Sequence, residues 1–475
     1  MKSSKPYYQA SLLTIIKTKV GIKSMEYQYA LSYPILSHSL MSEKDAIKTK
    51  YICLLKQYFD AICSDDLPTK VRLDRFILDF LAPTSPSPKV NDSVEKDILK
   101  TRFTPFRLFS YRYVFLFDCI FLLAPENHSK AIQIVDRMKS TVHSRYHRKM
   151  DFLVDAMFHN SSDLLSFPLI TPEMIQSWDK LQRYIRSTEK KVIITATMSS
   201  GKSTLINALI GRELSFSKKA ACTATVMDFI PSPVYHHLYH ALDSNHPRYN
   251  LSQADIKRIT DGLNTPLCVV GYFESILNKC KVRIIDTPGV NSSLNPLHKQ
   301  ITRNALSLQY YDVIVYVIPV ESYGSANDYD HLQFIKQKAS YGKIIFVVNM
   351  MDTCDLEDDS ISDILADVSE HLIDLGFNHP IVCPISAKAG LLFKQALTGI
   401  ELSKNDSKAL IAYYSKYAAP EYDLRECYAA LPEPELHKSD YKYSHIITEQ
   451  LLYQAFISTG LPQFEQCITD ALKET

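Results

Sequence analysis

Residues Val192–Gly211 read VIITATMSSGKSTLINALIG and predict a strand, a tight turn and a helix in direct succession. The β-branched start is typical of a strand, and the apolar spacing after GKST indicates a helix. Backbone N–H groups of residues 198–203 and the positive end of the helix then face an anion. Because GKST stands between a strand and a helix, we interpret the stretch as a phosphate-binding loop. A chance GKST turn is the alternative, and both flanking elements disfavour it.

The residue types of this loop suit a nucleotide with its magnesium ion. Lys202 brings a mobile positive charge to the β- and γ-phosphates, and the Ser203 hydroxyl is a hard oxygen ligand for Mg²⁺. Ala196 stands where the usual pattern has glycine, which causes little strain if its φ is negative. The predicted nucleotide-binding residues of the loop are Met198, Ser199, Ser200, Gly201, Lys202, Ser203 and Thr204.

Length and composition describe a globular chain of two or three domains. The 475 residues are 46% apolar and 22% charged, which is close to the average of globular proteins. The net charge of +1 gives no global field that would attract nucleic acid or an anionic membrane. Only 12 glycines beside 29 tyrosines suggest much helix outside the nucleotide domain.

The cysteines and the apolar stretches indicate a cytoplasmic protein. None of the cysteines forms a C-x-x-C pair, so we expect reduced thiols rather than a disulfide framework or a zinc site. The longest apolar stretch, Tyr113–Ala124, is broken by Asp118 and is shorter than the ~20 residues of a membrane span. Peripheral attachment to a membrane stays open.

The chain divides into a helical part and an alternating part. Residues 1–170 are predicted to be a mostly helical N-terminal domain, and residues 171–189 a linking helix that begins at Thr171 and Pro172. In residues 190–475 strands alternate with helices, which implies an α/β domain with a mainly parallel sheet and helices on both faces. Its ligand should lie beyond the carboxyl ends of the strands. The predicted strands are 192–195, 224–230, 282–285, 313–318, 343–348 and 381–384.

Two motifs at strand edges offer groups for the metal and the γ-phosphate. Thr223, before the second strand, can coordinate Mg²⁺ through its hydroxyl and hold the attacking water with its carbonyl. The motif DTPG ends the third strand: the Asp286 carboxylate serves the Mg²⁺ shell, and the Gly289 N–H can reach the γ-phosphate. Each motif is weak alone, and DTPG gains weight from the phosphate-binding loop before it.

Two later motifs favour guanine as the base. In NMMD, Asp352 can accept hydrogen bonds from the guanine N1–H and exocyclic amine, which adenine cannot offer. Met350 replaces the lysine whose stem usually covers the base. In the SAK turn, the Ala387 N–H would meet guanine O6. The predicted base-binding residues are Asn349, Asp352, Ser386, Ala387 and Lys388.

The ordered set GKST, Thr223, DTPG, NMMD and SAK resembles a TRAFAC-type P-loop GTPase, and its details resemble the bacterial members of the dynamin-like family. The stretches MSSGKSTLINALIG, CTAT and DTPGVNSSLNPLHKQIT carry this resemblance. It covers about residues 170–400 and resumes near Gly460. The resemblance implies Mg²⁺-dependent hydrolysis of GTP to GDP and phosphate, coupled to dimerisation through the GTPase domain and to a conformational change.

The resemblance also implies roles for single residues. Ser199, two positions before Gly201, would help to stabilise the transition state without an arginine finger. Val290 stands where Ras-like proteins carry a water-orienting glutamine, so water positioning would fall to Thr223 and the backbone. The predicted catalytic residues are Lys202, Ser199, Thr223 and Gly289, and the predicted metal ligands are Ser203, Thr223 and Asp286.

Outside the GTPase core the resemblance weakens. We interpret residues 391–458 as an insertion with partial helix, and Leu461–Leu472 as the closing helix of the GTPase domain. A stalk-like bundle would have to come from the N-terminal domain or from a partner chain. The expected partners are GTP or GDP, a second copy of this chain and a stalk-supplying chain, while contact with a membrane stays open.

Two other functions fit parts of the sequence. A guanine-nucleotide-gated interaction scaffold with little hydrolysis would suit the departures at Ala196 and Met350. An Era-like GTPase that acts on RNA would need a basic appendage, for which Arg137–Lys149 is the only candidate. A solvated helix face is the simpler interpretation of that segment, and the net charge of +1 argues against nucleic acid.

Overall fold

The chain forms two compact units. The first holds the chain up to Ser187 together with Ser232–His236, and the second holds Thr188–Pro231 and His237–Thr475. The domain boundaries expected at residues 170 and 190 stay predictions. The computed structural model describes residues 26–31, 33, 38–81, 109–216, 226–243, 247–261, 265–290, 296–308, 311–338, 343–356, 360–428, 436 and 447–475.

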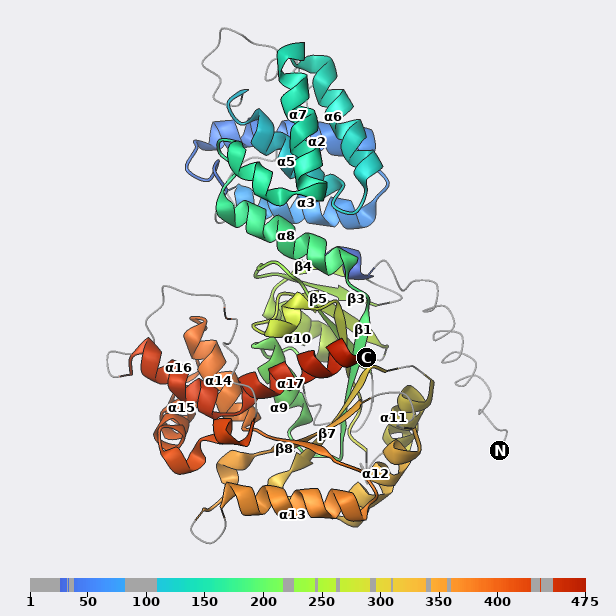
Figure 1. Ribbon diagram of the computed structural model, residues 1–475, viewed down its shortest axis with the longest axis vertical. Coiled ribbons are helices and arrows are strands. Elements are labelled where there is room, and N and C mark those ends of the chain that lie inside the picture. The colour runs from blue at the N-terminus through green and yellow to red at the C-terminus, as the bar shows by residue number, and fades with distance from the viewer. Residues whose placement is uncertain are drawn as a thin grey trace. The chain divides into compact units, whose positions relative to one another are not determined.

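The first unit is built from helices, as predicted for the N-terminal domain (Figure 1). Helix α5 lies in its core, and every residue of α5 after Arg112 is buried. Helix α8 begins as expected, because the Thr171 hydroxyl accepts a hydrogen bond from the Met174 N–H at 3.2 Å. The helices are η1 (Glu26–Ala30), α2 (Asp45–Ile62), α3 (Leu67–Phe80), α5 (Arg112–Leu123), α6 (His128–Thr141), η3 (Ser144–Tyr146), α7 (His147–His159), η4 (Ser161–Ser166) and α8 (Pro172–Arg186).

Asp118, which interrupts the apolar stretch of α5, is fully buried and hydrogen-bonded. The hydroxyls of Tyr33 and Tyr51 donate to its carboxylate, and His38 Nε2 lies 2.8 Å from one of the carboxylate oxygens. A buried carboxylate needs such partners because it has lost its hydration. In the described part of the chain, no helix combines the length and the apolar character that crossing a membrane requires.

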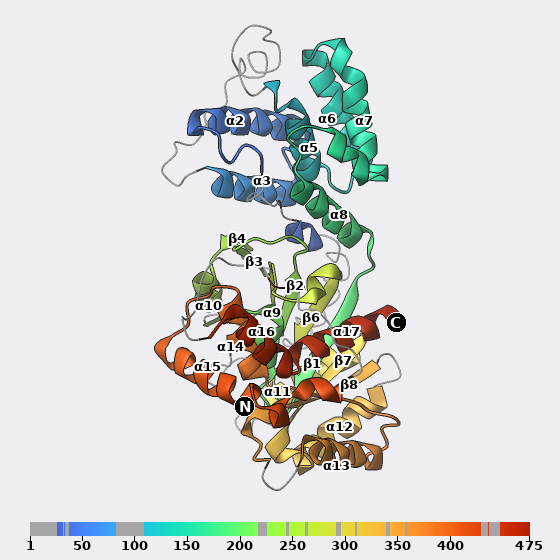
Figure 2. The same cartoon turned by 60° about the vertical axis from the view of Figure 1, so that its left-hand side comes forward.

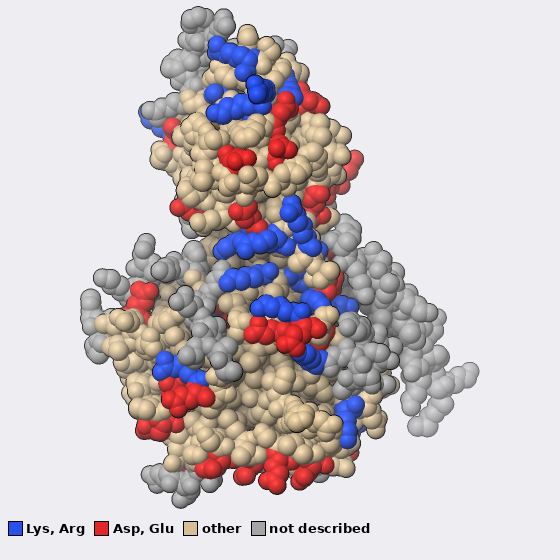
Figure 3. All heavy atoms as spheres, in the orientation of Figure 1, with Lys and Arg blue, Asp and Glu red and all other residues tan. Residues whose placement is uncertain are grey.

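The basic segment Arg137–Lys149 contacts other side chains of its own unit. The guanidinium of Arg137 lies 5.0 Å from the centroid of the Tyr58 ring, and Lys139 forms an ion pair with Asp151. Figure 3 shows lysine and arginine side chains at one end of this unit with acidic side chains beside them. These contacts support the simpler interpretation of the segment as a solvated helix face with local partners.

The described residues of the second unit form a nine-stranded sheet in the order β4-β3-β5-β2-β6-β1-β7-β8-β9 (Figures 1 and 2). Its strands β6, β1, β7, β8 and β9 are all parallel, whereas β2 runs antiparallel to β6. The mainly parallel sheet is therefore confirmed. The strands are β1 (Lys190–Ala196), β2 (Met227–Pro231), β3 (Tyr239–Leu242), β4 (Arg248–Leu251), β5 (Leu267–Gly271), β6 (Val282–Asp286), β7 (Val313–Pro319), β8 (Lys343–Asn349) and β9 (Ile381–Pro384).

Three of these strands, β3, β4 and β5, are not predicted by the sequence pattern. Strands β3 and β4 have four residues each, and β4 carries polar side chains at the edge of the sheet. Strand β5 is a five-residue apolar run that is buried throughout. Periodicity alone does not separate so short an apolar run from other buried segments.

Helices cover the sheet on both faces, as predicted (Figures 1 and 2). Helices α9, α14, α16 and α17 pack against one another, and α11 packs against α12. The closing helix expected at Leu461–Leu472 is α17, and the described part of the insertion contains α15 and α16. The helices are α9 (Lys202–Ile210), α10 (Gln253–Asp261), η5 (Ile276–Lys279), α11 (Pro296–Leu308), η6 (Val320–Ser322), α12 (Ala326–Lys338), η8 (Met351–Thr353), α13 (Ile361–Asp374), α14 (Ala387–Leu397), α15 (Lys404–Tyr417), η9 (Pro420–Tyr422), η10 (Leu424–Cys427), α16 (Glu449–Ser458) and α17 (Leu461–Glu474).

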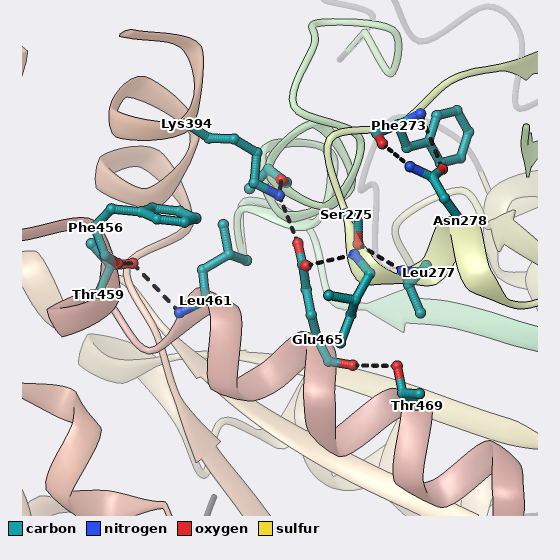
Figure 4. Close-up of polar contacts among 12 residues, drawn as sticks. Phe273, Ser275, Leu277, Asn278, Lys394, Phe456, Thr459, Leu461, Glu465 and Thr469 are labelled. Atoms are coloured by element: carbon teal, nitrogen blue, oxygen red, sulfur yellow. Dashed lines mark hydrogen bonds and ion pairs between the residues drawn. The ribbon is translucent and has the colours of Figure 1, made fainter. Parts of the chain in front are cut away.

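A buried ion pair connects α9, α14 and α17 (Figure 4). Lys394 Nζ lies 2.6 Å from Glu465 Oε1 and also donates to the Ala208 carbonyl of α9 at 2.7 Å. Glu465 Oε2 accepts a hydrogen bond from the Ile276 N–H at 3.4 Å. Burial raises the pKa of Glu465, and the charge of Lys394 opposes that rise. The pair holds the C-terminal end of α9 against the helices that close the domain.

Candidate nucleotide-binding site

Four of the predicted motifs lie at one edge of the sheet. Strand β1 ends at Ala196, β6 at Asp286, β8 at Asn349 and β9 at Pro384, and each strand leads directly into a motif. These strands belong to the parallel part of the sheet, where carboxyl ends meet at the same edge. Motifs that are far apart in the sequence therefore face one site.

The departure from the usual loop pattern at Ala196 causes no strain. Ala196 is the last residue of β1 and pairs with Val317 of β7. It is not among the residues with a positive φ. A side chain is compatible with this extended backbone, so the position does not require glycine.

The loop itself needs glycine at position 201. Gly201 has a φ of 80°, and a Cβ atom there would lie 2.3 Å from the side-chain nitrogen of Asn349. Ser199 also adopts a positive φ, 64°, and is exposed together with Met198, whereas Ser200 is buried and donates to the Thr197 carbonyl at 3.0 Å. The loop thus combines an exposed tip with a tightly packed base.

Asp286 contacts two polar side chains at the phosphate end of the site. Its Oδ1 forms an ion pair with Lys202, and its Oδ2 accepts a hydrogen bond from the Ser215 hydroxyl at 2.9 Å. Ser203 follows Lys202 in the first turn of α9. Lys202 and Ser203 of GKST therefore lie beside Asp286 of DTPG, a motif that is predicted separately.

Ser215 is a site residue that the sequence pattern does not indicate. Asn207 of α9 holds it in place: Asn207 Oδ1 accepts from the N–H groups of Leu214 and Ser215 at 2.9 and 2.8 Å, and its Nδ2 donates to the Ser215 carbonyl at 2.8 Å. A polar residue among the apolar residues of LINALI was the available signal.

The chain after β6 joins the phosphate-binding loop directly. Val290 forms a bridge with Thr197, and the Met198 N–H donates to the Val290 carbonyl at 3.2 Å. A Cβ atom on Gly289 would lie 3.3 Å from Met198 Cγ, so Gly289 packs closely against the loop. Thr223 lies outside the described residues.

Asn349 connects the phosphate end of the site to the base end. Its Nδ2 donates to the Ser200 carbonyl at 3.1 Å, and its Oδ1 accepts from the Ala387 N–H at 3.1 Å. The N–H predicted to meet guanine O6 therefore donates to Asn349 in this structure. One buried amide links the phosphate-binding loop to the SAK turn.

Asp352 and Met350 line the base end. The Ser386 hydroxyl donates to Asp352 Oδ1 at 2.5 Å, which orients the carboxylate. Met350 has a φ of 68°, and its Cε lies 3.3 Å from the position that a Cβ atom on Gly201 would occupy. Methionine therefore reaches over the phosphate-binding loop from the position where the usual motif has lysine. Lys388 forms an ion pair with Asp406 of α15 at 3.0 Å.

The donor chemistry of the site fits Mg²⁺ bound with a nucleotide. The described residues contain no group of three or more His, Cys, Asp or Glu side chains able to hold a metal by themselves. Mg²⁺ in nucleotide sites needs fewer protein ligands, because phosphates and waters fill its shell. One hydroxyl, Ser203, and one carboxylate, Asp286, are hard oxygen donors of that kind.

A phosphate-binding loop, a carboxylate after β6, and an Asn–Asp pair beside a SAK turn define a P-loop nucleotide-binding protein of the GTPase class. Residues 192–352 match the model of the dynamin family. Over these residues the sequence is accordingly dynamin-like, and the surrounding sheet has the fold of a P-loop GTPase domain. No curated protein matches the chain.

Several solved structures are distantly similar. A structure of Era from Aquifex aeolicus bound to GDP and AlF4⁻ is 21% identical, with 42% of this chain and 52% of that chain covered and a TM-score of 0.27. An oligomerised bacterial dynamin pair, described as sensing and tethering membranes, is 14% identical over 80% of this chain and 57% of that chain, with a TM-score of 0.34. Toc33 from Arabidopsis thaliana with Mg²⁺ and GMPPNP is 13% identical, with 61% of this chain and 86% of that chain covered and a TM-score of 0.31. The chain thus spans about half the length of the first two structures.

Proposed function

We propose that this chain binds GTP with Mg²⁺ and hydrolyses it to GDP and phosphate by in-line attack of water, at a rate that rises when two GTPase domains pair. The observation that carries the proposal is the bridge by Asn349, which joins the phosphate-binding loop to the base-reading turn. The match to the dynamin family over residues 192–352 supports the reaction class.

The phosphate end of the site supplies charge and orientation. Lys202 and the loop N–H groups bind the β- and γ-phosphates, and Ser203 with Asp286 would hold Mg²⁺, which neutralises phosphate charge. The Gly289 N–H senses the γ-phosphate. By the family resemblance, Ser199 stabilises the transition state and Thr223 positions the metal and the water. Catalysis then comes mainly from positioning and electrostatics.

The base end selects guanine. The Asp352 carboxylate, oriented by the Ser386 hydroxyl, accepts from the guanine N1–H and exocyclic amine. Adenine offers no such pair of donors, so the partly buried Asp352 carboxylate would lack these two hydrogen bonds with ATP. Met350 covers the base in place of lysine.

Phosphate release measured at rising protein concentration tests the proposal. We expect the rate per molecule to climb with protein concentration, because pairing of GTPase domains completes the site. The Lys202→Ala variant serves as the blank at each concentration. Release that is absent at every concentration, with GTP bound, would contradict the proposal and support a nucleotide-gated scaffold.

Ser215→Ala is expected to weaken the hold on Mg²⁺, because Asp286 Oδ2 loses its hydroxyl donor. We expect the Mg²⁺ concentration for half-maximal nucleotide binding to rise about tenfold, the usual effect of one hydrogen bond to a charged group. Titration of Mg²⁺ against a fluorescent GTP analogue measures it. Ser215→Thr should retain the hydroxyl and the wild-type value.

The matched control for this titration is Ser369→Ala. The Ser369 hydroxyl donates only to the Leu365 carbonyl of its own helix, α13. An equal Mg²⁺ shift in Ser369→Ala and Ser215→Ala would show that the effect is not specific to the metal site.

A further inference from the structure

Helix α15, which belongs to the insertion without an assigned role, packs against the base end of the site. Its residues Asp406, Tyr413 and Lys416 are spaced by seven and three positions, which places them on one face of the helix. All three side chains are partly buried. Each of them meets a different part of the base-reading motifs.

Lys416 holds the backbone of the NMMD turn. Its ammonium donates to the carbonyl of Asp352 at 2.7 Å and to the carbonyl of Cys354 at 3.2 Å. The same ammonium lies 4.1 Å from the centroid of the Tyr422 ring, whose hydroxyl also donates to the Cys354 carbonyl at 3.4 Å. The turn that carries the guanine-reading carboxylate is therefore tied to α15 by charge-assisted hydrogen bonds.

Tyr413 acts on the Asp352 carboxylate itself. Tyr413 lies near the carboxylate of Asp352, and burial together with this negative charge raises the pKa of Tyr413 to about 12. Tyr413 therefore stays protonated and remains a donor at neutral pH. The Ser386 hydroxyl orients the carboxylate through Oδ1, and Tyr413 lies beside it.

Asp406 anchors the other base-reading motif. Its Oδ1 forms the 3.0 Å ion pair with Lys388 of the SAK turn, and its Oδ2 accepts from the Ser403 hydroxyl at 2.7 Å at the start of α15. The carboxylate is thus fixed on both oxygens. One helix contacts both NMMD and SAK.

We propose that α15 determines the base specificity of the nucleotide site. Its side chains Tyr413, Lys416 and Asp406 hold Asp352 and the SAK turn in the positions that bind guanine. This inference rests on the proposed function, since it assigns the selection of the base to that site. Preorganised acceptors bind the matching donors at a lower entropic cost than acceptors that must be ordered on binding. Loss of a contact from α15 should therefore lower the ratio of the affinities for guanine and for other bases by a larger factor than it lowers the affinity for the phosphates.

The binding of GDP and IDP to the 475-residue chain, measured by calorimetry, tests the inference. Hypoxanthine, the base of IDP, lacks the exocyclic amine of guanine, so the ratio of the two dissociation constants reports how well Asp352 receives that amine. Wild-type protein should prefer GDP. In Tyr413→Phe and Lys416→Met, which keep the ring and the aliphatic stem, we expect the preference to fall about tenfold.

Tyr414→Phe and Lys408→Met are the matched controls on the same helix, where Lys408 is exposed and Tyr414 is partly buried. Both controls should keep the wild-type preference. A preference retained in Tyr413→Phe and Lys416→Met, or an equal weakening of GDP and IDP, would overturn the inference. A wild-type protein without any preference for guanine would overturn the proposed function as well, so the two failures are distinguishable.

Discussion

Lys202→Ala is expected to abolish GTP turnover, with kcat/KM lower by at least ~100-fold. Lys202 is the first residue of α9, and its ammonium, only 11% exposed, is paired with Asp286 at the phosphate end of the site. Alanine removes the mobile charge that we propose for the phosphates and leaves the Asp286 carboxylate without its cation. Steady-state phosphate release with saturating Mg²⁺ measures the loss.

Lys473→Ala is the control for this variant. Lys473 is 66% exposed and pairs with Asp470 on the surface of α17, so its removal takes the same charge from the same domain without touching the site. Turnover should stay at the wild-type rate. If Lys202→Ala hydrolyses GTP as fast as wild type, the assignment of the phosphate site is wrong.

Lys394→Met is expected to cost about 3–5 kcal/mol of unfolding free energy, because it leaves Glu465 buried without its partner. Methionine keeps the aliphatic volume of the stem but neither the ion pair nor the hydrogen bond to the Ala208 carbonyl. Chemical denaturation of this variant and of the wild type measures the difference in the free energy of unfolding. Lys343→Met, whose ion pair with Glu474 is solvent-exposed, should cost no more than about 1 kcal/mol.

The pH dependence of the Lys394→Met penalty identifies its cause. Burial already raises the pKa of Glu465 in the folded protein, and loss of the lysine charge raises it further. Between the pKa of Glu465 in the unfolded state and its higher pKa in the folded variant, the folded state keeps a proton that the unfolded state has released. The stability of the variant therefore falls as the pH rises through this range. We expect a smaller penalty near pH 5 than near pH 8. The double variant Lys394→Met/Glu465→Leu should recover most of the loss, and a pH-independent penalty would contradict the explanation.

Most of the fold follows from local patterns in the sequence. The six predicted strands are apolar runs, and four of them, β1, β6, β8 and β9, lead directly into a recognisable motif. The pattern misses β3 and β4, which have four residues each, and β5, a buried apolar run that no motif follows. Their pairing depends on partners that no local window contains.

The phosphate and base motifs could be predicted because each is a short contiguous run that follows a recognisable strand. Parallel strands then bring the runs to one edge, so Lys202 pairs with Asp286, and Asn349 reaches the phosphate-binding loop, without any further information. The residue types at these positions, an ammonium, a carboxylate and an amide, are those that the proposed binding of phosphate, Mg²⁺ and guanine requires. For these groups, order along the chain was sufficient.

Only the tertiary structure shows which ordinary polar residues support that site. Ser215 meets Asp286 across 71 positions, and Lys416 meets the Asp352 carbonyl across 64. In the sequence, a serine in a turn and a lysine on a helix are indistinguishable from solvated residues. Their contacts depend on how distant elements pack, and packing is a property of the whole core rather than of any single segment.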